Sequence, residues 1–120
     1  MRAIFIDSVN QIIKEVELNS SLDYEQYIGR IEIATELDVP GELGRADTIY
    51  VSEDGIAESE QMGGYGISVK DAHQPFFFGD GLVMGTDWTT GKTVDAKISI
   101  SELNKIIKFK NISKFRMSIP

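Results

Sequence analysis

Short runs of β-forming residues, each bounded by turn residues, recur along this 120-residue chain and constrain its fold more than any other feature. The clearest runs are residues 30–37, 47–52 and 81–86, and the first of them alternates apolar with polar side chains. Alternation with a period of two predicts a strand with one face in the core and the other in water. We therefore expect six apolar residues of these runs in the core: Ile31, Ile33, Ile49, Val51, Leu82 and Met84.

Other apolar runs of strand length predict the rest of the sheet. They lie at residues 3–6, 12–18, 67–69, 75–78, 93–100 and 109–119, the last as an edge strand. Residues 8–11 suit a hairpin turn between the first two runs. Asp54-Gly55 predicts a second hairpin, because this pair readily adopts the positive φ angles of such turns. The polar, glycine-rich stretch 58–66 is expected to be a loop.

Two short helices complete the predicted fold. The first starts at Ser20 or Ser21, either of which is a suitable N-cap, and runs through Ile28 to Gly29. The second covers residues 102–108, after Ser99 and Glu102 at capping-box spacing. Strands outnumber helices, so the expected class is α+β, with a mainly antiparallel sheet in one compact domain over residues 1–120.

The amino-acid composition limits which cellular compartment and which kinds of partner we expect. The chain has no cysteine, which favours a reducing cytoplasm and excludes thiolate metal sites. No run approaches the roughly 20 apolar residues of a membrane span, so we expect no membrane partner. The pI of about 4.6 disfavours a general nucleic-acid binder, because such proteins are usually basic overall.

Charge is divided between the two halves of the chain. Residues 1–60 hold fourteen acidic and four basic residues, a net charge of −10, whereas residues 61–120 have a net charge of +3. Such a dipolar chain suits a charged partner or a second copy of itself. We single out one acidic interaction cluster, Glu53, Asp54, Glu58 and Glu60. The matching basic segment consists of Lys105, Lys108, Lys110, Lys114 and Arg116.

No catalytic or metal-binding motif is recognisable. His73 is the single histidine and has no cysteine or serine motif beside it, so we expect a surface histidine, no catalytic residue, no metal and no cofactor. Carboxylates are abundant, and the pairs available for acid–base chemistry or Mg²⁺ are Glu53 with Asp54, or Asp80 with Asp87. The glycines of residues 63–66 lack the Lys-Ser/Thr of a phosphate-binding P-loop.

Aromatic residues offer two further candidate positions. In a strand, the consecutive Phe76, Phe77 and Phe78 point alternately to the two faces, so we expect core packing with a ring left at the surface, or a ligand platform. Trp88 lies in a predicted turn, where we expect it to pack against the core.

Four stretches resemble one known family. They are the opening A-I-F-I-D at residues 3–7, Y-I-G-R-I-E at 27–32, D-T-I-Y-V-S-E-D-G at 47–55 and G-D-G-L-V-M-G-T-D at 79–87. Together they resemble a family of uncharacterised proteins encoded by phages, prophages and plasmids. This chain has Ser52 where the family pattern has Asn, and residues 57–78 align poorly. The resemblance implies a mobile-element context and no particular chemistry.

Three function classes remain from the sequence. The first is a small acidic protein-interaction module, or inhibitor of a host factor, that binds an unknown protein partner and forms a homodimer. The second is an accessory protein that contacts nucleic acid through the basic C-terminal segment, which the overall charge makes the weaker candidate. The third is an enzyme that uses carboxylates alone. We expect binding rather than catalysis, and the question of an enzyme stays open.

Overall fold

The computed structural model describes residues 1–38, 45–54 and 63–111, which form two antiparallel sheets and short helices. The larger sheet has the order β2-β1-β7-β4-β3, and β8 also pairs with β7. Its strands are β1 (Arg2–Asp7), β2 (Ile12–Glu17), β3 (Ile31–Asp38), β4 (Arg45–Ser52), β7 (Gly81–Asp87) and β8 (Thr93–Val94). The smaller sheet has the order β6-β5-β9, with β6 (Phe77–Phe78), β5 (Tyr65–Val69) and β9 (Ile107–Asn111). The predicted antiparallel α+β fold is confirmed.

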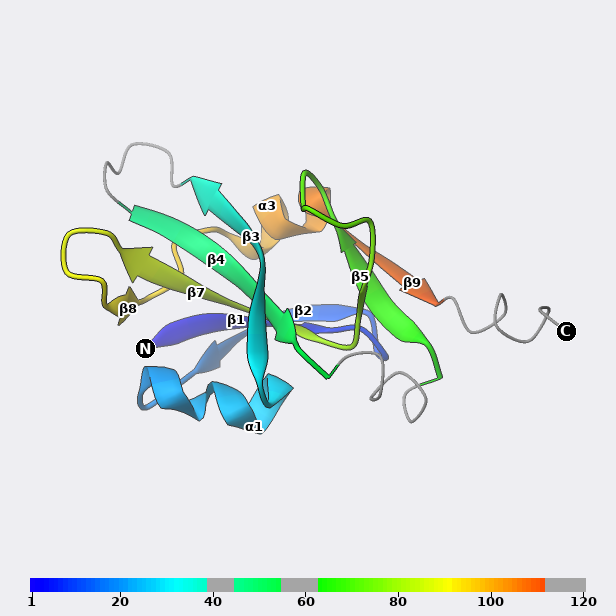
Figure 1. The fold of residues 1–120 in the computed structure, drawn as a ribbon, viewed down its shortest axis with the longest axis horizontal. Coiled ribbons are helices and arrows are strands. Elements are labelled where there is room, and N and C mark those ends of the chain that lie inside the picture. The colour runs from blue at the N-terminus through cyan, green and yellow to red at the C-terminus, as the bar shows by residue number, and fades with distance from the viewer. Residues whose placement is uncertain (39–44, 55–62, 112–120) are drawn as a thin grey trace, which may run out of the picture.

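The large sheet separates two hydrophobic cores. One lies between this sheet, the small sheet and helix α3 (Ile100–Ile106), and includes Ile4, Ile6, Ile49, Ile67, Phe77, Val83 and Leu103. The other lies between the opposite face and helix α1 (Glu25–Ile28), and includes Ala3, Leu18, Ile28, Leu82 and Met84. Figure 1 shows α1 and α3 on opposite sides of the large sheet. Both faces of β7 are therefore buried, which explains its nearly continuous apolar sequence.

Five of the six predicted core residues are buried or half-buried, and Ile33 is exposed. Ile49, Val51, Leu82 and Met84 are buried, and Ile31 packs at the margin of the second core. Ile33 is 49% exposed, so its predicted burial is wrong.

Ile33 lies on the face of β3 that belongs to the second core, but at a place that this core does not cover. Its opposite residue Tyr50 and the preceding Ile31 pack against the second core, whereas Ile33 itself stays exposed. Ala34 points to the other face and is buried in the first core, with 1% exposure. A β-bulge between Ile33 and Thr35 then reverses the inward and outward positions, so Leu37 packs against the first core as well.

Both predicted helices exist, with altered boundaries. The first begins as a 3₁₀ turn, η1 (Ser21–Tyr24), and continues as α1 to Gly29, whose φ of 62° suits glycine. The second starts where Ser99 Oγ accepts the backbone N–H of Glu102 at 3.1 Å, as the capping-box spacing predicts. It ends at Ile106 instead of residue 108, because Ile107 already has the extended backbone of β9. No helix within the described ranges has the length and apolarity to cross a bilayer.

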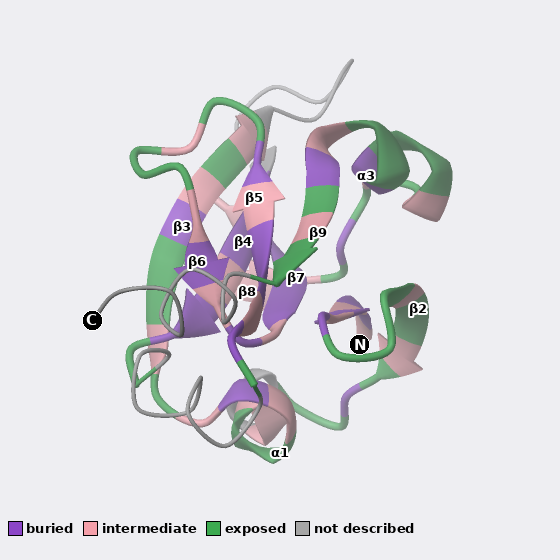
Figure 2. Ribbon diagram, turned by 90° about the vertical axis from the view of Figure 1, so that its right-hand side faces the viewer, coloured by how far each residue is buried: buried purple, intermediate pink, exposed green. Residues whose placement is uncertain are grey.

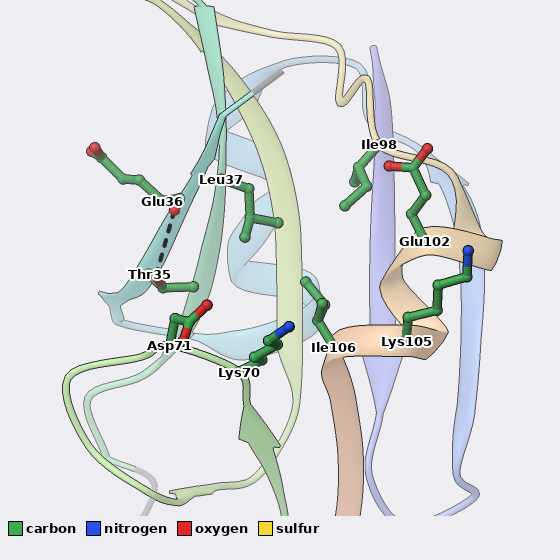
Figure 3. Close-up of a pocket in the computed structure, with 9 residues that line it drawn as sticks. All are labelled: Thr35, Glu36, Leu37, Lys70, Asp71, Ile98, Glu102, Lys105 and Ile106. Carbon is green, nitrogen blue, oxygen red and sulfur yellow. Dashed lines mark hydrogen bonds between the residues drawn. The ribbon is translucent and has the colours of Figure 1, made fainter. Parts of the chain in front are cut away.

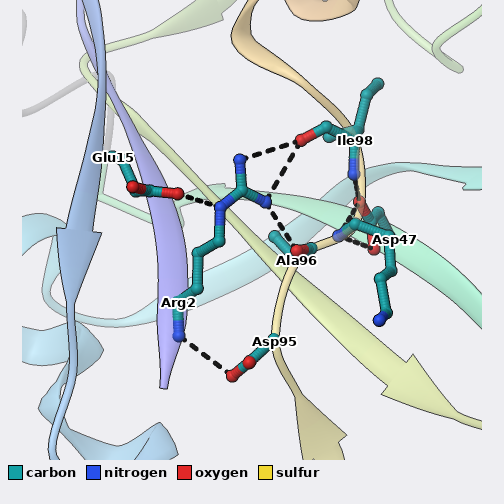
Figure 4. A network of polar contacts seen from close by, with 7 residues as sticks. Arg2, Glu15, Asp47, Asp95, Ala96 and Ile98 are labelled. Atoms are coloured by element: carbon teal, nitrogen blue, oxygen red, sulfur yellow. Dashed lines mark hydrogen bonds and ion pairs between the residues drawn. The ribbon is translucent and has the colours of Figure 1, made fainter.

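The predicted strand 93–100 is mostly not a strand. Only β8 pairs with β7, and residues 95–99 instead bond to side chains and backbone of the large sheet. The buried carboxylate of Asp47 accepts the backbone N–H groups of Lys97 at 2.8 Å and Ile98 at 2.6 Å. The Arg2 guanidinium donates to the carbonyl oxygens of Ala96 and Ile98 (Figure 4). A buried carboxylate and a guanidinium thus replace a β-ladder and fix the chain where it enters α3.

The turn after β4 does not form the predicted hairpin. Glu53 and Asp54 are turn residues, but β4 pairs with β3 and β7, and the next strand, β5, belongs to the other sheet. Gly55 itself lies outside the described residues. Of the predicted loop 58–66, residues 58–62 also lie outside them, and Tyr65 and Gly66 begin β5.

Candidate anion-binding face

Four lysines surround one cavity at the outer face of the small sheet. Lys108 of β9 lies directly opposite Ser68 of β5, and Lys110 lies opposite Gly66. Directly opposite residues of an antiparallel pair project to the same face, and so do alternate residues of one strand, which adds Lys70. The cavity measures about 320 Å³ and is lined by Ser68, Lys70, Lys105, Ile106, Lys108 and Lys110. We call this surface the lysine face.

Buried neighbours hold these lysines in place. Lys105 lies in the last turn of α3, which Leu103 anchors in the first core with no exposure. The backbone N–H of Lys70 donates to the carbonyl of Ile106 at 2.9 Å, which extends the β5–β9 ladder up to the helix. The α3 helix passes into β9 without a loop, so the helix and strand position their lysines together.

The lysine face has an uncompensated positive charge. All four lysines are exposed. Among residues 1–38, 45–54 and 63–111, no carboxylate lies within ion-pair distance of any of their ammonium groups. Alternate residues of a strand are only about 7 Å apart, so these like charges repel one another. An anion placed between them relieves that repulsion.

A second hollow borders the lysine face. Its volume is about 440 Å³, and it shares Lys70, Lys105 and Ile106 with the first cavity (Figure 3). Three acidic residues, Glu36, Asp71 and Glu102, line the remainder together with Thr35, Leu37 and Ile98. The positive surface is therefore bounded on this side by carboxylates, which direct an anion towards β5 and β9.

The predicted basic segment is only partly described. Lys105, Lys108 and Lys110 line the cavity, whereas Lys114 and Arg116 lie outside the described residues. Sequence reasoning missed Lys70, which is 35 residues or more before the others and reaches them through the β5–β9 pairing. The available signal was its position directly after the predicted strand 67–69, two residues from Ser68. The sequence did not indicate which strand pairs with that one.

The predicted acidic cluster is only partly described and stays a prediction. Glu53 forms an ion pair with Arg30, with 2.9 Å between Oε2 and Nη2. The hydrogen bonds that Arg30 donates to the Glu53 carboxylate, together with the charge of Asp54, hold the pKa of Arg30 above its ordinary value. Asp54 is exposed, and Glu58 and Glu60 lie outside the described residues. One of the four acids is thus already paired with an arginine, which directly precedes β3.

The second carboxylate pair proposed from the sequence does not come together. Asp80 and Asp87 flank the whole length of β7, about 20 Å by strand geometry. Asp80 accepts both the backbone N–H and the hydroxyl of Ser8, at 2.8 and 3.0 Å. Within the described ranges, no three His, Cys, Asp or Glu residues are grouped so as to hold a metal ion.

His73 and Trp88 lie at the surface. The His73 side chain contacts the carbonyl of Ala34 through Nδ1 at 3.0 Å, and the residue is exposed, as expected. Trp88 is 53% exposed in the turn between β7 and β8, so its predicted core packing is wrong. The turn is closed by backbone bonds between Asp87 and both Gly91 and Lys92, and it holds the indole away from either core.

Comparison of the chain with models of known protein families, with curated proteins and with solved structures finds no match. The resemblance to the mobile-element family therefore stays a prediction.

Proposed function

We propose that the protein binds a phosphate-rich polyanion, a nucleic acid, through the lysine face. The observation that carries this proposal is the convergence of four of the chain's eight lysines on one cavity, without a carboxylate partner in the described part of the chain. Phosphate groups spaced along a backbone match cations spaced along two strands. A nucleic-acid partner also fits the mobile-element context that the sequence resemblance implies.

The net charge of −7 limits the affinity of the protein for a polyanion. Exposed acids elsewhere repel a polyanion over distances of about one Debye length, roughly 8–10 Å at physiological salt. Binding is therefore local to the lysine face and sensitive to salt. Four phosphate contacts predict a slope of log K against log salt of about −2.8 for single strands and about −3.6 for duplex DNA.

A charge-matched pair of variants tests this function. Fluorescence anisotropy of a labelled 20-nucleotide DNA, single-stranded and duplex, is measured between 50 and 200 mM NaCl. We expect Lys108→Gln/Lys110→Gln to weaken binding and to reduce the slope by roughly 1.4–1.8. The control, Lys14→Gln/Lys92→Gln, removes two exposed lysines that do not line the cavity, and should retain the slope. Equal losses in both variants, or no binding by the unmodified protein, refute the proposal.

The exposed edge of β3 supports a second candidate, a protein-interaction module. β3 is the last strand in the order of the large sheet and presents Glu32, Ile33 and Glu36 to solvent. Edge strands accept a strand from another protein, and these side chains suit a basic partner with an apolar anchor. Affinity purification of the unmodified protein and of Glu32→Lys/Glu36→Lys tests it. A partner bound by the first and absent from the second supports this module, and an identical set of partners contradicts it.

A further inference from the structure

Two aromatic rings lie beside the lysine face. The rings of Phe76 and Phe78 contact each other edge to face, with centroids 5.0 Å apart and planes at 89°. Both residues are partly exposed, whereas Phe77 between them is 2% exposed and packs into the first core. The alternation that the sequence predicts for this run is therefore present, with two rings at the surface instead of one.

Gly66 lies between the aromatic rings and the lysines. It lies in the middle strand, opposite Phe78 on one side and opposite Lys110 on the other. A Cβ at Gly66 would lie 2.5 Å from Cζ of Phe76, so the Phe76 ring covers this glycine on the face to which Lys110 projects. Because β6 and β9 are separated by one strand, the aromatic pair and the lysines are about 10 Å apart. Figure 2 shows β6, β5 and β9 side by side in this order.

A small hollow accompanies the aromatic pair. Its volume is about 130 Å³, and Phe76, Phe77 and Phe78 line it together with Glu32, Ser52, Glu53 and Gln74. This is well below the roughly 300–1,000 Å³ of a drug-sized ligand site, and suits one planar ring system. The two carboxylates repel phosphate, so this end of the surface favours an uncharged aromatic group and the lysine end favours the phosphates.

We propose that the nucleic acid is single-stranded, with its backbone on the lysine face and a base stacked against Phe76 and Phe78. This inference rests on the proposed function. Single-strand binding sites combine a basic path for the backbone with aromatic rings for unpaired bases. The bases of a duplex are already stacked and paired, and cannot reach the rings. The phenyl rings at β6 and the lysines beside β5 and on β9 follow the polarity of a nucleotide, from neutral base to charged phosphate.

Three ligands and two kinds of variant test the inference. The ligands are a labelled 12-nucleotide single strand of mixed sequence, its duplex, and inorganic polyphosphate, which carries phosphates without bases. Phe78→Leu keeps an apolar side chain without the π face, and Phe76→Tyr retains the ring as the matched control. We expect Phe78→Leu to weaken single-strand binding by about 5- to 150-fold. Its binding of duplex and polyphosphate should not change, and Phe76→Tyr should bind all three like the unmodified protein.

The outcomes separate this inference from the function on which it rests. If Lys108→Gln/Lys110→Gln weakens binding of all three ligands and Phe78→Leu weakens none, the polyanion function stands and the single-strand inference is overturned. Duplex bound as tightly as single strand by the unmodified protein overturns it as well. If none of the three ligands binds, the proposed function fails and the inference fails with it. Circular dichroism of each variant verifies that the fold is retained.

Discussion

The buried carboxylate of Asp47 gives the sharpest stability prediction. Its side chain is 1% exposed and accepts two backbone N–H groups, from Lys97 and Ile98. Asp47→Ala removes both bonds and leaves two donors in a partly buried site. Each bond to a charged acceptor contributes about 1.5–3 kcal/mol, so the expected loss is roughly 3–6 kcal/mol. Domains of this size have a free energy of unfolding of about 5–15 kcal/mol, so the variant loses a large part of its stability.

Urea denaturation followed by circular dichroism measures this loss. With a slope of about 1–3 kcal/mol per molar urea, the midpoint should fall by roughly 2 M. Asp95→Ala is the matched control, because Asp95 is exposed and accepts the backbone N–H of Arg2 at 2.9 Å. A hydrogen bond at such a site is worth about 0.5–1.5 kcal/mol. If both variants shift the midpoint equally, the Asp47 carboxylate is not what holds residues 95–99 against the large sheet.

Three further predictions concern the fold and the assembly. Ile49→Asp should cost several kcal/mol, because Ile49 has no exposure, whereas Ile33→Asp on the neighbouring strand should stay within about 0.5 kcal/mol; equal urea midpoints would contradict the different burial of these two residues. Gly66→Ala should lower the melting temperature, because its Cβ would lie 2.2 Å from the carbonyl oxygen of Phe77; an unchanged melting temperature would contradict this close approach. β9 is the last strand in the order of the small sheet among the described residues, and this edge predicts a symmetric dimer; sedimentation of a monomer at high micromolar concentration would exclude it.

Local patterns were sufficient to predict most elements of the fold. Alternation over residues 30–37 located β3, and capping residues located the start of α3, because both depend on neighbours in the sequence. The exposure of Ile33 could not be predicted, since how far the second core extends along β3 depends on residues distant in sequence. The strand 93–100 was overestimated for a similar reason: its partner is a side chain, Asp47, instead of a ladder.

The sequence predicted less of the candidate site than of the fold. Lys105, Lys108 and Lys110 were found because they are close in sequence. Their proximity to Lys70 and to the ring of Phe76 depends on the pairing of β5 with both β6 and β9. The acidic cluster stays a prediction: Glu53 pairs with Arg30, the charge of Asp54 acts on the same guanidinium, and Glu58 and Glu60 lie outside the described residues.

The central position of β7 determines when this chain can fold during its synthesis. The hairpin of β1 and β2 and the pair of β3 and β4 do not touch each other through backbone bonds, because β7 lies between them. Two-stranded units of this kind are at most marginally stable alone. At about 5–20 residues per second, the ribosome adds the roughly 35 residues between the end of β4 and the end of β7 in about 2–7 s. During that interval the nascent chain has four complete strands but no closed sheet, so its unpaired edges are exposed to chaperones and proteases.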